Sequence, residues 1–240
     1  MKLIKEEIEF IEHYLIKNGV KYWDVRIELL DHIVSAVEDK IEQEGVSFNE
    51  ALLDVHQSFG NRTKTFGIYN DKLMKTGLYA DNNGFKKFTR KKQKELGRKY
   101  RNLTLKELKK MLVSPAFLLE YTSIILLFVI VFQYWPKTTG FIGLVVLMLP
   151  YFFSAFHSLK DKSTRKSLNI MIVGNMGFLF FSLYNLGIQI FNSYYEAEIH
   201  KPFIIFAIMT CLLYPIMRTN INVYFLAYKE HKNMYELMLT

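Results

Sequence analysis

Residues Ala116 to Trp135 read AFLLEYTSIILLFVIVFQYW, and this stretch decides the fold. Its 20 residues contain one charged side chain, Glu120. An α-helix of this length extends about 30 Å, which is the thickness of the hydrocarbon core of a bilayer. The Ser114–Pro115 pair before it is typical of a helix start, and the aromatic pair at its end suits a membrane interface. The stretch predicts a transmembrane helix and excludes a purely soluble enzyme.

Three more apolar runs follow, and we expect four spans at about 116–135, 140–158, 168–191 and 203–226. The fourth run is unbroken only to Met217, so the side chain of Arg218 is expected to extend to the interface. Basic residues concentrate before the first span and in the loop at 159–167, and such loops stay in the cytoplasm. The chain also starts with an acidic, amphipathic segment and not with a signal sequence. We therefore expect a multi-pass membrane protein with both termini in the cytoplasm.

Charge divides the chain into three zones. Lys and Arg number 6 against 13 Asp and Glu in residues 1–60, 16 against 4 in 61–115, and 9 against 6 in 116–240. Zones this different do not form one uniform domain. We expect an all-α protein made of an acidic helical cytoplasmic domain (1–60), a basic juxtamembrane linker (61–115) and a four-helix transmembrane domain (116–240). Within the linker, a weak helix flanked by loops is expected over 61–83.

The second half of the linker is strongly basic and contains regularly spaced apolar side chains, which predicts an amphipathic helix at the membrane surface. Nine residues are the predicted ligands of lipid headgroups: Lys86, Lys87, Arg90, Lys91, Lys92, Lys94, Arg98, Lys99 and Arg101. Each basic residue near anionic headgroups contributes about 1 kcal/mol of attraction. Basic residues interleaved with aromatic ones are also typical of a surface that binds nucleic acid. We favour lipid because the positive-inside rule already accounts for the charge.

The first zone has the spacing of three short amphipathic helices. We expect Asn18–Gly19, Glu44–Gly45 and Gly60 to end them, and Ser47 with Glu50 to form a capping box at the start of the third. The residues expected to face inward are Ile4, Ile8, Ile11 and Leu15 in the first helix, Trp23, Ile27, Leu30, Val34, Val37 and Ile41 in the second, and Ala51, Leu52, Val55 and Phe59 in the third. Such a small core predicts that the domain relies on a partner or on dimerisation.

This zone resembles the HAAS signalling domain of bacterial membrane proteins. The matching pieces are ELLDHI at 28–33, VE at 37–38, EGVSFNEAL at 44–52 and the closing Phe59–Gly60, where the family usually has Leu-Gly. The resemblance covers about a quarter of the chain. It implies a regulatory module that precedes a transmembrane region in the bacterial cytoplasmic (inner) membrane and is associated with PadR-like transcriptional regulators. The family supplies no catalytic residue.

A protein partner would meet the acidic surface of this domain. The predicted partner-binding residues are Glu28, Asp31, His32, Glu38 and Glu42. The first three lie within one helical turn, so a metal site with His56 approaching from the third helix is an alternative. A four-coordinate zinc site needs ligands that this trio does not supply, so we favour a surface Glu–His pair and expect no bound metal.

The third predicted span carries a polar stripe of Asn175, Ser182, Asn185 and Gln189. A stripe at this depth is expected to face into the helix bundle. It either makes interhelical hydrogen bonds, with partners such as Ser154 and Thr210, or lines a hydrated cavity for a small solute.

No nucleotide-binding loop, zinc-protease motif or nucleophile elbow occurs in the sequence, and the single Cys211 allows no intramolecular disulfide. We therefore expect no catalytic site and no cofactor. The leading hypothesis is an integral membrane regulatory protein whose cytoplasmic module binds a protein partner, with a homo-oligomer as a further option. The alternative is a transport component in which the polar stripe lines a solute path and the module docks an ATPase.

Overall fold

The computed structural model describes residues 2–63, 79–176, 182–183, 185–187, 189 and 201–239. These residues are helical apart from turns and one short β pairing, which confirms the all-α class. The chain divides into two compact units. Unit 1 contains Met1–Glu95 and Lys166–Leu168, and unit 2 contains Leu96–Arg165 and Asn169–Thr240. Each unit is described separately below.

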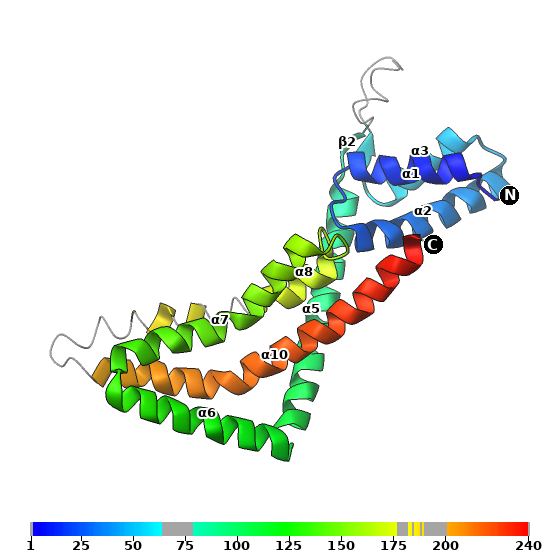
Figure 1. The fold of residues 1–240 in the computed structure, drawn as a ribbon. Helices are drawn as coiled ribbons and strands as arrows, with labels where there is room; N and C mark the ends of the chain where they lie inside the picture. Colours follow the sequence, from blue (N-terminus) through cyan, green and yellow to red (C-terminus); the bar gives the residue numbers. More distant parts are fainter. Residues whose placement is uncertain are drawn as a thin grey trace. The chain divides into compact units, whose positions relative to one another are not determined.

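Unit 1 contains the three predicted helices: α1 (Lys5–Lys17), α2 (Trp23–Glu44) and α3 (Phe48–Ser58) (Figure 1). The first two end as expected, because Gly19 and Gly45 have φ angles of +81° and +67°. An L side chain is strained in this left-handed region, so glycine is the favoured residue there. Both α1 and α3 contact α2, which makes α2 the centre of the module.

The buried face of α2 differs from the predicted one. Its buried residues are Trp23, Val25, Leu29, Ile33 and Val37, so only the first and last belong to the predicted stripe. Ile27 is 36% exposed, and Ile4 of the first predicted stripe is 59% exposed. At about 100° per residue, the observed stripe of α2 lies roughly a quarter turn from the predicted one. The apolar residues of α2 cover more than one face, and its contacts with α1 and α3 decide which part is buried.

The fourth component of unit 1 is the first part of α5 (Asn83–Leu112). Phe85 is 2% exposed, and its ring lies 5.9 Å from the rings of both Tyr14 and His56 and 5.6 Å from that of Phe59. The buried side chain of Asn61 accepts hydrogen bonds from the amides of Gly84 and Phe85 at 2.9 and 3.3 Å, which caps the start of α5. The compact unit therefore extends beyond residue 60 and uses a residue of α5 in its core.

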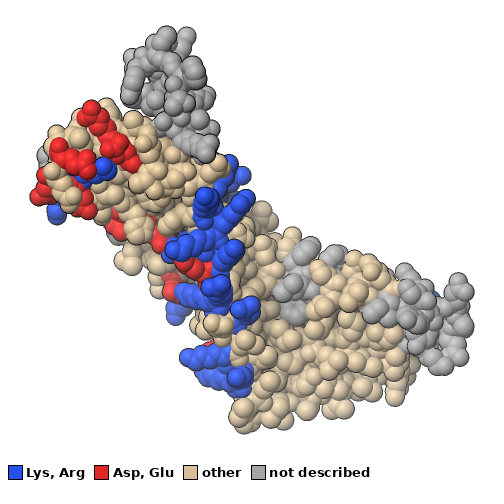
Figure 2. All heavy atoms as spheres, turned by 180° about the vertical axis from the view of Figure 1, so that it is seen from behind, with Lys and Arg blue, Asp and Glu red and all other residues tan. Residues whose placement is uncertain are grey.

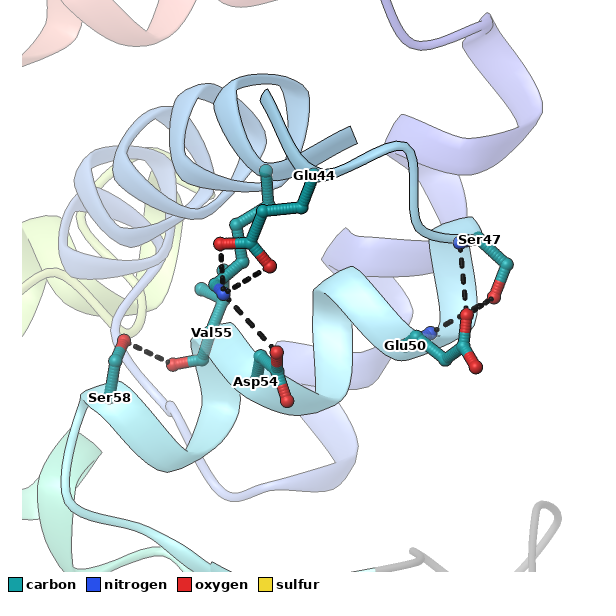
Figure 3. Close-up of polar contacts among 7 residues, drawn as sticks. Glu44, Ser47, Glu50, Asp54, Val55 and Ser58 are labelled. Atoms are coloured by element: carbon teal, nitrogen blue, oxygen red, sulfur yellow. Dashed lines mark hydrogen bonds and ion pairs between the residues drawn. The ribbon is translucent and has the colours of Figure 1, made fainter. Parts of the chain in front are cut away.

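The predicted capping box is confirmed (Figure 3). Ser47 Oγ accepts a hydrogen bond from the Glu50 amide at 3.4 Å, and the Glu50 carboxylate accepts from the Ser47 amide at 3.1 Å. The Ser47 hydroxyl and amide also lower the pKa of Glu50. In the same view, the carboxylates of Glu44 and Asp54 converge on the ammonium of Lys40 at 3.1 and 3.2 Å, which joins the end of α2 to α3.

The segment expected to be a weak helix over 61–83 has a different structure at its ends. Arg62–Thr63 (β1) pairs antiparallel with Tyr79–Asp81 (β2), and the intervening part lies outside the described residues. The two strands bring the end of the three-helix segment next to the start of α5.

Unit 2 contains the remainder of α5 together with α6 (Pro115–Tyr134), α7 (Pro136–Lys160), α8 (Leu168–Asn175) and α10 (Lys201–Leu239). Helices α6, α7 and α10 pack against one another (Figure 1). One buried cluster joins these three helices and consists of Phe117, Leu147, Tyr214 and Met217. A second joins α5, α8 and α10 and consists of Tyr100, Ile170, Val173, Val223, Tyr224 and Ala227.

Within the described residues, α6 alone is by itself long and apolar enough to cross a membrane. Helix α7 meets the same criterion only if its halves Pro136–Leu149 and Tyr151–Lys160, bent by 48°, form one span. A proline between the halves accounts for such a bend, because it removes a helical hydrogen bond. The predicted loop at 136–139 is the first turn of α7, and α10 continues to Leu239. Four separate spans therefore remain an expectation.

Small residues allow close approach of helices in unit 2. A Cβ on Gly143 of α7 would overlap the Thr210 hydroxyl of α10, and one on Gly174 of α8 would overlap the Ser154 hydroxyl of α7. Small residues at such positions let helix backbones pack closely in membranes. Ser154 and Thr210, the expected hydrogen-bond partners of the polar stripe, lie at these glycine contacts.

Replacing Gly143 with Ala is expected to lower the thermal stability of the full-length protein in detergent. The added methyl group would displace Thr210, and overpacking of this kind costs about 1–3 kcal/mol. Gly97→Ala in α5 is the matched control, because nothing lies within 4 Å of a Cβ there. That variant should gain up to about 1 kcal/mol from helix propensity. Equal shifts in the two melting temperatures would contradict the close contact between α7 and α10.

Candidate functional site

The predicted partner-binding residues lie on one face of α2. Glu28, Asp31, Glu38 and Glu42 recur at spacings of three, four and seven residues, and His32 lies beside them. At about 100° per residue this face is opposite the buried stripe, so it points away from the core of the module. Asp31, His32 and Glu42 are exposed, whereas Glu28 and Glu38 are half-buried. We call this surface the acidic face of α2, and it includes the exposed Asp39.

Glu28, His32 and Glu38 contact other parts of unit 1. Glu28 forms an ion pair with Lys92 of α5, and Glu38 accepts a hydrogen bond from the amide of Leu3 at 2.8 Å. The His32 ring lies 6.2 Å from that of Phe88, in an edge-to-face arrangement. These contacts give Glu28, His32 and Glu38 a structural role. The exposed carboxylates of this face are Asp31, Asp39 and Glu42, and their exposure makes them the better candidates for binding a partner.

His56 does not approach the Glu28–Asp31–His32 trio. It is buried against Tyr14, whose hydroxyl is hydrogen-bonded to His56 Nδ1, and against Phe85. Across the described ranges, no three His, Cys, Asp or Glu residues are placed together to hold a metal ion. His56 therefore belongs to the core of unit 1.

The basic helix α5 presents most of its charge to the surroundings. Of the nine predicted headgroup ligands, eight are exposed: Lys86, Lys87, Arg90, Lys91, Lys94, Arg98, Lys99 and Arg101. Figure 2 shows Lys and Arg side chains gathered in a stripe on one face. Lys92 is the exception, because its pair with Glu28 covers it and raises its pKa. Exposed ammonium and guanidinium groups in a row can bind phosphate oxygens by charge-assisted hydrogen bonds.

Sequence reasoning missed a contact between α2 and the segment Lys166–Leu168. Both oxygens of Asp24 are used, because Oδ1 accepts from the Leu168 amide at 3.0 Å and Oδ2 accepts from the Ser167 hydroxyl at 3.1 Å. In return, the Trp23 amide donates to the Lys166 carbonyl at 2.9 Å. The start of α2 and the start of α8 thus satisfy each other's free polar groups, as capping residues do within one helix.

The backbone of Lys166 is strained at this contact, because its φ angle is +55°. This left-handed conformation is unfavourable by about 1 kcal/mol for a residue other than glycine, so the surrounding hydrogen bonds must hold it in place. Ser167 and Leu168 are 2% and 0% exposed. The contact joins residues about 144 positions apart in the chain, and no local sequence motif marks it.

The polar stripe of the third predicted span is exposed at all four of its residues, Asn175, Ser182, Asn185 and Gln189. These exposures do not support the predicted inward orientation of the stripe, and its role stays a prediction. The arrangement gives no support to a solute path along this segment.

Two charged residues of the predicted spans, Glu120 and Arg218, meet in unit 2. Glu120 Oε1 of α6 accepts a hydrogen bond from the Tyr214 hydroxyl, and Arg218 Nε of α10 lies 3.2 Å from the same oxygen. Arg218 also donates to Asn222 Oδ1. The Tyr214 ring stacks on those of Phe117 and Tyr121, at 6.4 and 6.2 Å. The ion pair is about one-third exposed and links α6 to α10.

Comparisons with protein-family models, with curated proteins and with solved structures return no match to this chain.

The Glu28–Lys92 pair should stabilise unit 1 in a pH-dependent way. The pKa of Lys92 in the folded protein is raised by its hydrogen bond to Glu28, so this stabilisation is complete below the unfolded pKa of about 10.4. It is lost as the pH rises through the folded pKa. At neutral pH, Glu28→Gln is expected to cost up to about 1 kcal/mol in urea unfolding, and the difference from the parent protein should shrink as the pH rises through the folded pKa of Lys92. A difference that stays constant with pH would contradict the pair.

Removing both Glu120 and Arg218 should destabilise the protein less than removing Arg218 alone. Arg218→Leu leaves the carboxylate of Glu120 without its cation among apolar neighbours, and unpaired charges in such surroundings are strongly unfavourable. The double variant Glu120→Leu/Arg218→Leu removes both charges and should melt at a higher temperature than Arg218→Leu alone. Additive losses in the two single variants would show that the two side chains do not interact.

Proposed function

We propose that this chain is an integral membrane regulatory protein whose acidic N-terminal module binds a protein partner in the cytoplasm. The observation that carries the membrane part is the surface of α6. About 11% of its most apolar 18-residue window is buried, although it is long and apolar enough to cross a bilayer. The core helix of a soluble protein with this composition would be mostly covered, since large exposed apolar surfaces are unfavourable in water.

The surfaces of α7 and α10 also favour a bilayer environment. Their exposed large apolar side chains include Phe141, Val145, Phe152, Phe156, Leu159, Ile204, Ile208, Leu212 and Ile216. In the proposed arrangement α7, the third predicted span and α10 cross the bilayer beside α6, with both termini in the cytoplasm. The predominance of basic residues in α5 and in the loop at 159–167 favours this topology.

The regulatory part of the proposal rests on the module in unit 1. Its acidic face of α2 presents Asp31, Asp39 and Glu42 away from the core, and the sequence resembles the HAAS domain in this region. A partner with a basic surface, such as a PadR-like regulator, would be attracted by these carboxylates. Helix α5 would hold the module near anionic headgroups through its exposed basic side chains.

The Asp24 contact supplies a route by which partner binding could affect the membrane segments. Lys166–Leu168 packs within unit 1, while the chain on either side of it continues into α7 and α8. A change at α2 that releases Asp24 from Ser167 and Leu168 would free the connection between those helices. We therefore assign this contact the role of coupling element in the proposed regulatory function.

The proposal predicts that charge reversal of Asp31, Asp39 and Glu42 to Lys abolishes capture of a cytoplasmic partner from native membranes. These side chains are exposed, so the helical content should remain that of the parent protein by circular dichroism. The measurement is a quantitative pull-down with C-terminally tagged, full-length protein after chemical cross-linking.

Reversal of Glu6, Glu9 and Glu12 on α1 is the matched control, because these carboxylates are also exposed and the charge change is the same. It should leave capture unchanged. A regulatory docking role for α2 would be contradicted if both triple variants captured the same proteins as the parent, or if both lost them equally. Resistance of the protein to extraction by alkaline carbonate tests the membrane part separately.

A further inference from the structure

A hollow of about 180 Å³ lies between the turn that joins α1 to α2 and the start of α5. All of its described lining residues belong to unit 1: Asn18, Gly19, Val20, Lys21, Tyr22, Asn82, Phe85, Lys86, Thr89 and Arg90. Asn18, Val20 and Phe85 are buried and form its inner part, whereas Lys21, Lys86 and Arg90 are exposed. The hollow therefore has a buried interior and a basic rim.

The neutral polar groups of the lining are already used within the protein. Asn82 Nδ2 donates to the Asn18 carbonyl, and Asn18 Nδ2 donates to the Tyr14 carbonyl at 2.9 Å. The Thr89 hydroxyl donates to the Phe85 carbonyl at 2.9 Å. These bonds fix the shape of the hollow and leave its charged side chains as the groups available to a ligand.

The three cations of the rim have no acidic counterpart among the residues that the structure describes. None of the ten described lining residues is Asp or Glu, and neither Lys21, Lys86 nor Arg90 forms an ion pair with another described residue. Lys86 and Arg90 are four residues apart on α5 and so share one face, while Lys21 comes from the opposite wall. Three uncompensated charges around one concavity create a positive potential that favours an anion.

The size of the hollow limits the ligand. Drug-sized ligands occupy pockets of about 300–1,000 Å³, so a hollow of about 180 Å³ suits a small group. A phosphate group fits this requirement and offers several oxygens to the ammonium and guanidinium groups that line the hollow.

We infer that Lys21, Lys86 and Arg90 form a discrete binding site for one phosphate group, either free or carried by a lipid headgroup. The lipid source deepens the proposed function, because it would give α5 a specific headgroup site in addition to general attraction. The site differs from the predicted basic stripe in that it needs Lys21, which lies outside α5.

Two probes test the inference with full-length protein in a nonionic detergent. Equilibrium dialysis measures binding of radiolabelled inorganic phosphate, and native mass spectrometry measures occupancy by phosphatidic acid. Lys21→Gln and Arg90→Gln should each weaken binding of the recognised probe about tenfold, as expected for loss of one hydrogen bond to a charged group. Phosphate binding would identify the free anion as sufficient, whereas binding of phosphatidic acid alone would identify the lipid.

Lys17→Gln and Lys106→Gln are the matched controls, because both side chains are exposed, lie outside the hollow and carry the same charge. They should change the affinity less than twofold. If all four variants weaken binding alike, the discrete site is wrong and only general attraction to anionic lipid remains, which leaves the proposed function intact. Absence of saturable binding of either probe also overturns the inference.

Discussion

The apolar surface of α6 is the constraint on which the rest of the structure depends. A helix with bulky aliphatic side chains along most of its surface cannot remain uncovered in water, and unit 2 covers only a small part of it. A bilayer removes this cost without further protein contacts. The strongly basic α5 directly before α6, the proline start of α6 and the apolar surfaces of α7 and α10 are all consistent with that environment.

The N-terminal module shows how a small helical domain completes its core. Three short helices bury little apolar surface, and the structure adds Phe85 from α5 to the aromatic contacts of Tyr14, His56 and Phe59. Asn61 then satisfies the first amides of α5. Helix α5 thus contributes Phe85 to the core of the module and also carries the exposed basic side chains of its surface. Packing at Phe85 therefore fixes where Lys86 and Arg90 lie.

Polar side chains far apart in the sequence form hydrogen bonds and ion pairs with one another. Asp24 accepts from Ser167 and Leu168, Glu28 pairs with Lys92, and Glu120 meets Tyr214 and Arg218. Each contact involves a residue that looks like an ordinary surface charge in the sequence. A charged side chain can be partly buried when an opposite charge or a hydrogen-bond partner lies beside it. The paired residues therefore mark surfaces that pack against other parts of the protein. Among the described residues, the rim of the hollow is a place where charge remains without such a match.

The sequence by itself determined the helical class, the capping box of Ser47 and Glu50, the glycine ends of α1 and α2, and the apolar helix α6. These features depend on local backbone preferences and on composition, which a few neighbouring residues are enough to specify. Only the tertiary structure decided which part of the apolar surface of α2 is buried, that His56 belongs to the core, that the polar stripe is exposed, and that Asp24 and Glu120 have distant partners. A helix with a wide apolar surface can pack in several rotations, and a charged side chain can pair with any opposite group in reach. Both choices are made by contacts between segments far apart in the chain, so no local pattern encodes them.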